Sequence, residues 1–375
     1  MIFKKLSCLI LLWAAVSLCF PSLSAECGET HTHLKPPDAN WTWPQSTPEK
    51  EGLDPDKLRE LAELIRAGEK YPRLHALLVI RNGRLVMEEY FNWEADKLHM
   101  LQSVSKSFTS ALVGIAMGKG KIKGVEERLL DFFPERKPSE LENMDDRKEA
   151  IRLQDLLTMR SGTDYHESGP DSPHYKLNAL RTGWDTFYLN RPMRSRPGTS
   201  FLYDSGAVIV TSSILKNRTG KHADGFADDT LFKALGITNK MWLKNAEGHP
   251  HTGGGLNLVP LDTAKLGQLY LDKGRWEGIQ VVPEAWIEES TRRHVDLQGR
   301  GHIVGYGYWW WILVPDPAGE KNLDIYAAMG FKAQYIFVIP EHKMVVVVNG
   351  DTRSGTDQRK PIEFLYTHIL PSVRR

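Results

Sequence analysis

The strongest constraint on the fold is a pair of β-hairpin patterns that stand near opposite ends of the chain. Residues 74–80 and 84–91 are rich in β-branched and aliphatic side chains, and Asn82-Gly83 between them favours a tight turn with positive φ angles. Residues 334–340 and 344–349 form the second pair, which includes four consecutive valines typical of a buried strand. The two hairpins predict one sheet built from both ends of the chain, which the middle of the chain interrupts.

The middle of the chain differs in composition from both ends. It is rich in Gly, Pro and charge and carries short helical patterns, for example over residues 153–159. Helical spacing over residues 54–67 and 361–370 predicts helices that flank the sheet, and residues 306–314, with three consecutive tryptophans, predict a further strand. The predicted fold class is α/β (α+β), an antiparallel sheet flanked by helices with a mostly helical insertion. The sheet domain is assigned to residues 50–121 and 245–375, and the insertion to residues 122–244.

The first 25 residues follow the pattern of a secretory signal peptide. Two lysines precede an apolar stretch over residues 6–20, and small residues lead to Ala25. Residues 26–49 are predicted as an extended lead-in, in which His31 and His33 are expected to be solvated rather than to bind a metal. The alternative is a retained membrane anchor, although the apolar stretch is short for a span. We expect a secreted or periplasmic protein with no membrane span in the mature chain.

Charge and cysteine content exclude two classes of protein. The chain holds 48 Lys+Arg and 47 Asp+Glu, a net charge of +1; losing Lys4 and Lys5 with the signal peptide would give 46 − 47 = −1. A protein that binds nucleic acid usually shows a basic excess, so nucleic acid is not expected as a partner. Of the three cysteines only Cys27 would remain after cleavage, which excludes an internal disulfide scaffold and a four-thiolate zinc site.

Several common catalytic motifs are missing from the sequence. We find no Gly-x-Ser-x-Gly, which argues against the usual α/β-hydrolase arrangement. We also find no His-Glu-x-x-His, Cys-x-x-Cys, phosphate-binding loop or dinucleotide fingerprint. We therefore predict neither a metal nor an organic cofactor.

The tetrad Ser-x-x-Lys occurs twice, as Ser103–Lys106 and as Ser213–Lys216. A chance match is expected in a chain of this length, so the context has to separate the two. Lys216 comes just before Asn217 and Gly220 at the end of a helical pattern, where a lysine commonly meets unpaired carbonyl groups. Ser103 instead stands at the start of a helical pattern.

This placement gives Ser103 and Lys106 a possible chemistry. Residues three apart share one face of a helix, so the amine of Lys106 can reach the Ser103 hydroxyl. The positive end of the helix and partial burial both lower a lysine pKa. A neutral lysine can accept the serine proton and make the hydroxyl a nucleophile. The alternative is that Ser103 only caps the helix and Lys106 is solvated.

Four segments in order resemble the motifs of the serine β-lactamase and DD-peptidase superfamily, in its class C-like and esterase-like branch. The resemblance covers nearly the whole chain from about Pro48, and the fold class above is the one it implies. Its segments are Ser103-Val104-Ser105-Lys106-Ser107, Leu156-Leu157-Thr158-Met159-Arg160-Ser161-Gly162, Pro197-Gly198-Thr199-Ser200-Phe201-Leu202-Tyr203-Asp204-Ser205 and Gly253-Gly254-Gly255-Leu256.

The resemblance implies further site residues. It makes Tyr203 a second catalytic group beside Lys106 and Ser103, and a cationic lysine is expected to lower the pKa of this tyrosine so that it relays a proton. Ser205 is a candidate hydrogen-bonding neighbour. His251 either lines the pocket or is a structural histidine.

The third family motif departs from its usual pattern. The superfamily has Lys-Thr-Gly or His-x-Gly on a strand at the edge of the cleft, whereas this chain has Gly330-Phe331-Lys332-Ala333-Gln334. Phe331 replaces the cationic residue, and Lys332 is expected to point to the opposite face of that strand. Recognition of a substrate carboxylate by this motif is therefore in doubt. An amide of residues 331–334, with Phe331, Ala333 and Gln334 as candidates, is expected to form the oxyanion hole with the Ser103 N–H.

Three functions remain open from the sequence. The first is an exported serine hydrolase that cleaves a small ester or linear amide, similar to 6-aminohexanoate-dimer hydrolases. The second is a β-lactamase or DD-peptidase, and the third is a non-catalytic binding protein on the same fold. Aromatic residues of the insertion and of the tryptophan run either line an apolar pocket or belong to the core; they are Tyr165, Trp184, Phe187, Tyr188 and residues 308–311.

Overall fold

The computed structural model describes residues 41–169, 171–314 and 325–374, all of which fall within one unit, Leu34–Arg375. The predicted signal peptide, His31, His33 and the three cysteines lie outside the described residues. Within the described residues, no helix has the length and apolarity needed to cross a membrane.

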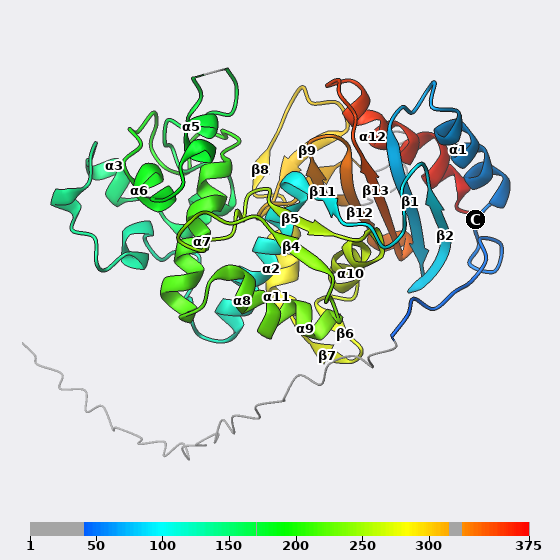
Figure 1. Ribbon diagram of the computed structural model, residues 1–375, viewed down its shortest axis with the longest axis horizontal. Helices are drawn as coiled ribbons and strands as arrows, with labels where there is room; N and C mark the ends of the chain where they lie inside the picture. The colour runs from blue at the N-terminus through cyan, green and yellow to red at the C-terminus, as the bar shows by residue number, and fades with distance from the viewer. Residues whose placement is uncertain (1–40, 170, 315–324, 375) are drawn as a thin grey trace, which may run out of the picture. The chain divides into compact units, whose positions relative to one another are not determined.

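An eight-stranded antiparallel sheet is built from both ends of the described chain (Figure 1). The predicted hairpins are both present, and β1 of the first pairs with β13 of the second. The strand order is β2-β1-β13-β12-β11-β10-β9-β8. The strands are β1 (Leu74–Arg81), β2 (Arg84–Tyr90), β8 (Val295–Asp296), β9 (Ile303–Tyr306), β10 (Trp311–Leu313), β11 (Ile325–Gly330), β12 (Gln334–Ile339) and β13 (Met344–Gly350).

The turn of the first hairpin has the geometry that its sequence predicts. Asn82 and Gly83 both have positive φ angles, 52° and 73°, and Arg81 pairs with Arg84 across the turn. Two consecutive left-handed residues match the right-handed twist of the flanking strands, and Asn-Gly tolerates this conformation. The local sequence therefore sets the register at this edge of the sheet.

The predicted strand over residues 306–314 is confirmed only in part, because a turn occupies the middle of this range. β9 ends at Tyr306 and β10 begins at Trp311, and a turn joins them in which Trp309 has a φ of 62°. The N–H of Gly307 donates to the Trp310 carbonyl (2.8 Å), and the Trp309 indole donates to the Leu156 carbonyl (3.0 Å). Both tryptophans are buried. A turn this deep in the core has the apolar composition of a strand, which explains the error.

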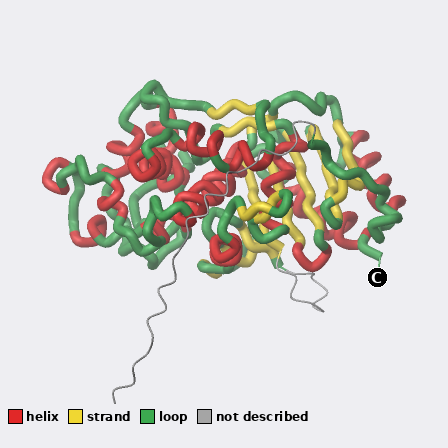
Figure 2. Tube along the Cα trace, turned by 90° about the horizontal axis from the view of Figure 1, so that it is seen from below, coloured by secondary structure: helices red, strands yellow, loops and turns green. Residues whose placement is uncertain are grey.

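Helices cover both faces of the sheet. Alternate residues of β1 face opposite sides, so that Leu77 and Val79 join one core cluster and Leu78 and Ile80 join the other. The first cluster includes the predicted flanking helices α1 (Pro55–Ala67), α12 (Lys360–Phe364) and the π-helix η6 (Leu365–Ile369); the second includes α2 (Ser105–Gly118) and α10 (Pro260–Leu271). Figure 2 shows the strands side by side, with helices around them.

The remaining elements lie mostly in the middle of the chain. Its helices are α3 (Asp146–Glu149), α4 (Leu153–Leu157), α5 (Pro173–Ala179), α6 (Trp184–Leu189), α7 (Ser205–Thr219), α8 (Ala223–Asp229) and α9 (Leu231–Leu235). A small sheet has the order β3 (His99–Met100), β5 (Leu256–Leu258), β4 (Lys240–Trp242); later elements are β6 (Arg275–Trp276), β7 (Ile279–Gln280) and α11 (Glu284–Thr291). Short 3₁₀ helices are η1 (Gln102–Val104), η2 (Leu129–Phe132), η3 (Pro138–Glu140), η4 (Pro340–His342), η5 (Asp357–Arg359) and η7 (Leu370–Ser372).

Helix α2 is the central element of the fold. Every residue from Ser105 to Ala116 is buried, because α2 packs against α7, α8, α9 and α11. A helix that is surrounded on all sides needs no polar face, and the second half of α2 is correspondingly apolar, whereas its first half buries Lys106 and several hydroxyl side chains. Helix α2 was assigned to the sheet domain, yet it packs on α7, α8 and α9 of the insertion. The predicted division between sheet domain and insertion stays a prediction.

Candidate active site

Ser103 lies in η1, which runs directly into α2. The sequence predicted that Ser103 opens a helix; the first turn is a 3₁₀ helix, and α2 itself begins two residues later at Ser105. Ahead of this turn, the N–H of Leu101 donates to the Leu256 carbonyl (2.9 Å). The Ser103 backbone is thus held between the small sheet and the central helix.

Lys106 is buried in the first turn of α2, with 2% of its surface exposed. Its Nζ lies 2.7 Å from Ser103 Oγ and 2.6 Å from the Gly253 carbonyl oxygen. Burial lowers the pKa of Lys106 to about 8, although the charges of Glu167 and Asp204 act in the opposite direction. The neutral fraction of the amine near neutral pH is therefore far larger than for a lysine in water, and this neutral form can accept the serine proton.

Tyr203 comes close to both residues from the segment before α7. Its ring centroid is 5.0 Å from Lys106 Nζ, and its hydroxyl is near enough to the Ser103 side chain for their interaction to lower the pKa of Tyr203. The expected lowering of the Tyr203 pKa is wrong: burial raises that pKa far above its usual value, the Glu167 charge raises it further, and only the Ser103 hydrogen bond opposes them. The phenol therefore stays protonated, because desolvation and the Glu167 charge outweigh the interaction with Ser103.

The glycine run of residues 253–255 packs tightly against α7 and His251. A Cβ atom added at Gly253 would lie 3.2 Å from the Ser205 carbonyl, and one at Gly255 would lie 2.9 Å from the His251 Cβ. This close approach brings the Gly253 carbonyl to the Lys106 amine. Larger side chains at these positions would push the carbonyl away.

Ser205 and His251 both line the same pocket as Ser103. The Ser205 N–H, at the start of α7, donates to Glu167 Oε1 (2.8 Å). His251 Nε2 lies 2.8 Å from Asn178 Oδ1. Burial and the charge of Lys106 lower the pKa of His251 to about 4, so this imidazole is neutral at physiological pH.

The pocket at Ser103 has a volume of about 710 Å³. Polar and apolar side chains both line its walls, which come from the small sheet, the helical middle of the chain and the turn before β12. The described lining residues are Met100, Gln102, Ser103, Glu167, His174, Tyr175, Asn178, Trp184, Ser205, Leu243, Lys244, His251, Gly253, Gly254, Gly255 and Phe331.

Residues 331–333 form a turn between β11 and β12, and the predicted strand through them is wrong. Phe331 lines the pocket with 56% of its surface exposed, and Lys332 points away to Asp351, with 2.6 Å between Nζ and Oδ1. Ala333 is buried. Gln334 is also buried, and its Nε2 donates to the carbonyls of Lys332 (3.0 Å) and Gly350 (2.6 Å), so its side chain braces the turn.

The β-lactamase family model matches residues 61–364 of this chain. That range contains both hairpins, α2, the glycine run and the turn before β12. The chain belongs to the β-lactamase family. The matched range includes Ser103, Lys106 and Tyr203. Family membership, together with the relatives described below, identifies the chain as a serine hydrolase.

Three relatives illustrate the range of the family. The 6-aminohexanoate-dimer hydrolase of Paenarthrobacter ureafaciens is 26% identical over 293 residues, which cover 72% of this chain and 71% of that protein. An Escherichia coli (strain K12) protein provisionally named a D-alanyl-D-alanine carboxypeptidase is 22% identical over 53% of this chain and 50% of its own. A solved Bacillus anthracis structure, provisionally named a 6-aminohexanoate-dimer hydrolase, has a TM-score of 0.70 at 20% identity and covers 91% of this chain and 90% of that one, which shows the shared fold.

Glu167 is a site residue that the sequence did not reveal. Its carboxylate lines the pocket, accepts the Ser205 N–H, and its charge raises the pKa values of Lys106 and Tyr203. It lies between α4 and α5, in a stretch without a helical or strand pattern. No spacing signal connects it to Ser103, so only the tertiary structure brings it to the site.

Asp204 is a second residue near the site that sequence analysis missed. It is buried and caps α7, with its Oδ1 accepting the Ala207 N–H (2.9 Å). Its Oδ2 accepts hydrogen bonds from Tyr188 (2.8 Å), Ser161 (3.2 Å) and Thr163 (3.3 Å). Burial raises the pKa of Asp204 to about 6 despite these bonds. An Asp directly before a helical pattern is an N-cap signal, which indicates the cap but not the buried hydrogen-bond cluster.

Most of the aromatic residues proposed for the pocket belong to the core instead. Tyr165, Tyr188 and Tyr308 are buried, and only Trp184 of the named set lines the pocket. Within the described ranges, no group of three or more His, Cys, Asp or Glu side chains is placed to hold a metal ion.

Proposed function

We propose that this chain hydrolyses small linear amides and esters through an acyl-enzyme on Ser103. The observation that carries the proposal is the buried Lys106 amine, 2.7 Å from the Ser103 hydroxyl and with a pKa lowered to about 8. A lysine in water is almost wholly protonated at neutral pH and cannot act as a base. Burial supplies the neutral amine that proton transfer from serine needs.

In the first step, Ser103 Oγ attacks the substrate carbonyl carbon and Lys106 accepts its proton. The carbonyl oxygen becomes negative, and we expect the Ser103 N–H and an amide of residues 331–334 to stabilise it. Collapse of this intermediate breaks the bond to the leaving group. The leaving alcohol or amine takes up a proton, for which the protonated Tyr203 phenol is the donor and the lysine ammonium replaces it.

In the second step, water attacks the Ser103 ester. Lys106, neutral again after the leaving group departs, accepts a proton from that water directly or through Tyr203. The bond between the carbonyl carbon and Ser103 Oγ then breaks, the Lys106 ammonium returns its proton to Ser103 Oγ, and the carboxylic acid leaves. The same three side chains thus serve both halves of the reaction.

The charge of the pocket favours this function over a β-lactamase or DD-peptidase. Substrates of those enzymes carry a carboxylate, which a cationic group must meet. Among the described residues that line the pocket, Lys244 is the only Lys or Arg, and its ammonium pairs with Asp224. Lys332 pairs with Asp351 outside the pocket, and Glu167 adds negative charge within it. Independently of the charge of the pocket, a relative named for hydrolysis of a linear amide dimer supports a linear amide as the substrate.

A labelling experiment tests the proposal. The chain is incubated with a fluorophosphonate probe and, separately, with a fluorescent penicillin, beside a Ser103→Ala variant and a Ser213→Ala control. We expect phosphonate labelling of the parent and of Ser213→Ala, none of Ser103→Ala, and little labelling by penicillin. Equal labelling of Ser103→Ala would remove the nucleophile assignment, and stable penicillin labelling would favour the second function. Matched p-nitrophenyl esters and p-nitroanilides then rank ester against amide hydrolysis.

We further propose that the protein is exported after cleavage near Ala25. The supporting observation is the basic, apolar and small-residue order of the first 25 residues. Intact-mass measurement of the chain from a Gram-negative host should show a periplasmic product that begins at Glu26. A product that retains residues 1–25 in the membrane fraction would indicate an anchor.

A further inference from the structure

Left-handed, non-glycine residues flank the Ser103 amide on two sides. Gln102, directly before Ser103, has a φ of 49°. Lys332 and Ala333, in the turn between β11 and β12, have φ angles of 65° and 67°. Such conformations are costly for residues with a Cβ, and they persist only where surrounding contacts enforce them.

The turn lies against the nucleophile's own backbone. A Cβ atom added at Gly330, the last residue of β11, would lie 2.6 Å from the Leu101 carbonyl and 3.1 Å from the Ser103 nitrogen. Only glycine leaves room for this approach. A small displacement of the turn would therefore move its amides relative to the Ser103 N–H.

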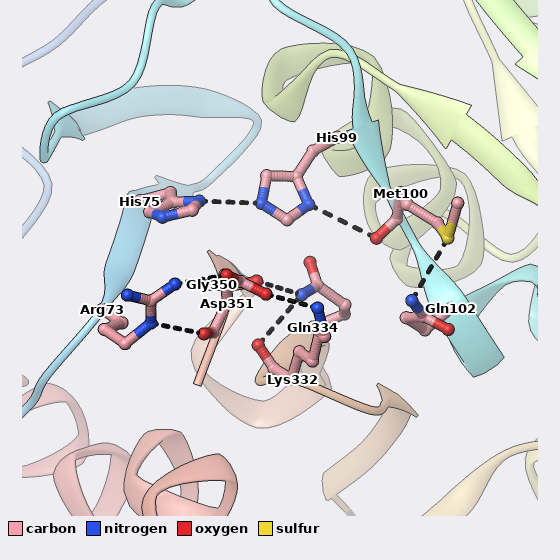
Figure 3. A network of polar contacts seen from close by, with 9 residues as sticks. All are labelled: Arg73, His75, His99, Met100, Gln102, Lys332, Gln334, Gly350 and Asp351. Atoms are coloured by element: carbon pink, nitrogen blue, oxygen red, sulfur yellow. Dashed lines mark hydrogen bonds and ion pairs between the residues drawn. The ribbon is translucent and has the colours of Figure 1, made fainter. Parts of the chain in front are cut away.

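Two ion pairs of Asp351, with Lys332 and with Arg73, form what we call the ionic clamp. This clamp holds the turn at residues 331–333 from the side away from the pocket (Figure 3). Asp351, which follows β13, pairs with Lys332 (2.6 Å) and with the guanidinium of Arg73. The Arg73 Nε also donates to the Asp351 carbonyl (2.7 Å), which ties the clamp to the segment before β1. From the interior, Gln334 donates to the Lys332 carbonyl (3.0 Å) and accepts from Asn349 (3.0 Å).

The same view shows how the strand before Ser103 is held. His75 Nδ1 lies 3.0 Å from His99 Nε2, and His99 Nδ1 lies 3.3 Å from the Met100 carbonyl oxygen. The Gln102 amide donates to the Met100 sulfur (3.2 Å). Two sets of contacts therefore support the surroundings of the Ser103 amide. His75 of β1 supports the strand before Ser103, and Arg73, just before β1, supports the turn at residues 331–333 through Asp351.

We propose that Asp351, through Lys332, is a positioning residue for the oxyanion hole. The ion pair stabilises the left-handed turn, and the turn presents its amides beside the Ser103 N–H. This inference rests on the proposed function, because the oxyanion exists only if Ser103 attacks a carbonyl. It explains why the lysine of this motif faces away from the pocket: it orders the turn instead of binding a substrate carboxylate.

Two substitutions of Lys332 distinguish an effect on the conformation of the turn from an effect of the lost positive charge. Lys332→Ala removes the ammonium and keeps a Cβ at the left-handed position, whereas Lys332→Gly removes the ammonium and also the conformational cost. We expect Lys332→Ala to lower the kcat of p-nitrophenyl ester hydrolysis about tenfold with KM changed less than about twofold, a fraction of the effect of losing an oxyanion donor. Lys332→Gly should stay within about threefold of the parent, since glycine adopts the turn without the clamp. Asp351→Asn should behave like Lys332→Ala.

A matched control exists elsewhere in the chain. Lys273 also has a positive φ, 53°, and pairs with Glu284 (2.8 Å), but it does not line the pocket. Lys273→Ala should leave kcat and KM unchanged. All rates are measured well below the Tm of each variant, so that a loss of stability alone does not alter kcat.

The outcomes distinguish this inference from the proposed function. Equal losses of kcat in Lys332→Ala and Lys332→Gly would overturn the positioning role, provided that the parent is active. An unchanged kcat in Lys332→Ala or in Asp351→Asn would also overturn it. A parent protein that neither hydrolyses esters nor reacts with a fluorophosphonate at Ser103 would overturn the proposed function itself.

Discussion

The two Ser-x-x-Lys tetrads of this chain share a sequence pattern and little else. Ser103 and Lys106 span η1 and the first turn of α2, and the buried amine lies 2.7 Å from the hydroxyl. Ser213 and Lys216 stand near the end of α7, and the Gly220 N–H donates to the Lys216 carbonyl (2.8 Å) at a left-handed helix end. Lys216 is half-buried and lines none of the Ser103 pocket.

The comparison shows that spacing alone does not make a lysine a base. Both tetrads place serine and lysine on one helix face. Lys106 is fully buried, with a carbonyl and a serine hydroxyl as its neighbours, and burial lowers its pKa to about 8, whereas Lys216 is only half-buried. The predictions below test this difference, beginning with the largest expected effect.

Replacing the two serines should have opposite consequences. Ser103→Ala is expected to lower kcat/KM for esters by about 10³-fold or more, because no acyl-enzyme forms and only the binding and oxyanion groups remain. Ser213→Ala should stay within about twofold of the parent. Steady-state hydrolysis with active-site titration measures both, and a comparable loss at Ser213 would reverse the assignment.

Replacing the two lysines should affect activity almost as unequally as replacing the two serines. Lys106→Met removes the base and should lower kcat about 10²- to 10⁴-fold. Because methionine is long and apolar, it fits the buried site, and the Tm should not fall. Lys216→Met serves as the control for activity. Retained turnover in Lys106→Met would show that another group accepts the serine proton.

Tyr203→Phe tests whether Lys106 is sufficient by itself. The phenylalanine keeps the packing of the ring and removes the protonated hydroxyl that faces Ser103. We expect kcat to fall about 10²-fold, with the fold retained by circular dichroism. Near-normal turnover would show that the lysine alone moves the protons.

The pH profile tests the desolvation of Lys106 directly. The neutral amine is the active form, so kcat/KM should rise with pH along a limb with an apparent pKa of about 8. Glu167→Gln removes a charge that raises the Lys106 pKa, so the limb should move to lower pH. Asp164→Asn, on the same loop but 3.5 Å from Arg191 and outside the pocket lining, should leave the limb in place. A shift of the Glu167→Gln limb to higher pH would contradict this interpretation.

The smallest expected effect concerns stability at the second tetrad. Lys216 lies in the last turn of α7, where a cation interacts favourably with the helix end. Lys216→Met should lower the free energy of unfolding by about 0.5 kcal/mol. Urea denaturation measures this change. A loss of several kcal/mol would indicate that Lys216 is more than a helix-end cation.

Local patterns were enough to predict much of the fold. Asn82-Gly83 predicts its hairpin because two left-handed residues are needed at that turn, and Asp54 with Pro55 marks the start of α1. The buried turn at Trp309 and the left-handed Lys332 and Ala333 were not predictable in this way. Their residue types favour strands or are neutral, and their conformations are imposed by contacts with distant segments such as Leu156 and Asp351.

By itself, the sequence determined the sheet built from both ends, the helix that follows Ser103, and the three-residue spacing that lets Lys106 reach its hydroxyl. Each hairpin, the helix and the spacing follow from interactions between near neighbours in the chain, whereas the pairing of β1 with β13 joins residues far apart in the sequence. Only the tertiary structure decided that Lys106 is desolvated, that Tyr203 stays protonated, and that Glu167 and Asp204 add their charges to the site. The physical reason is that desolvation and electrostatic interaction depend on distance in space, and the groups responsible are far apart in the sequence.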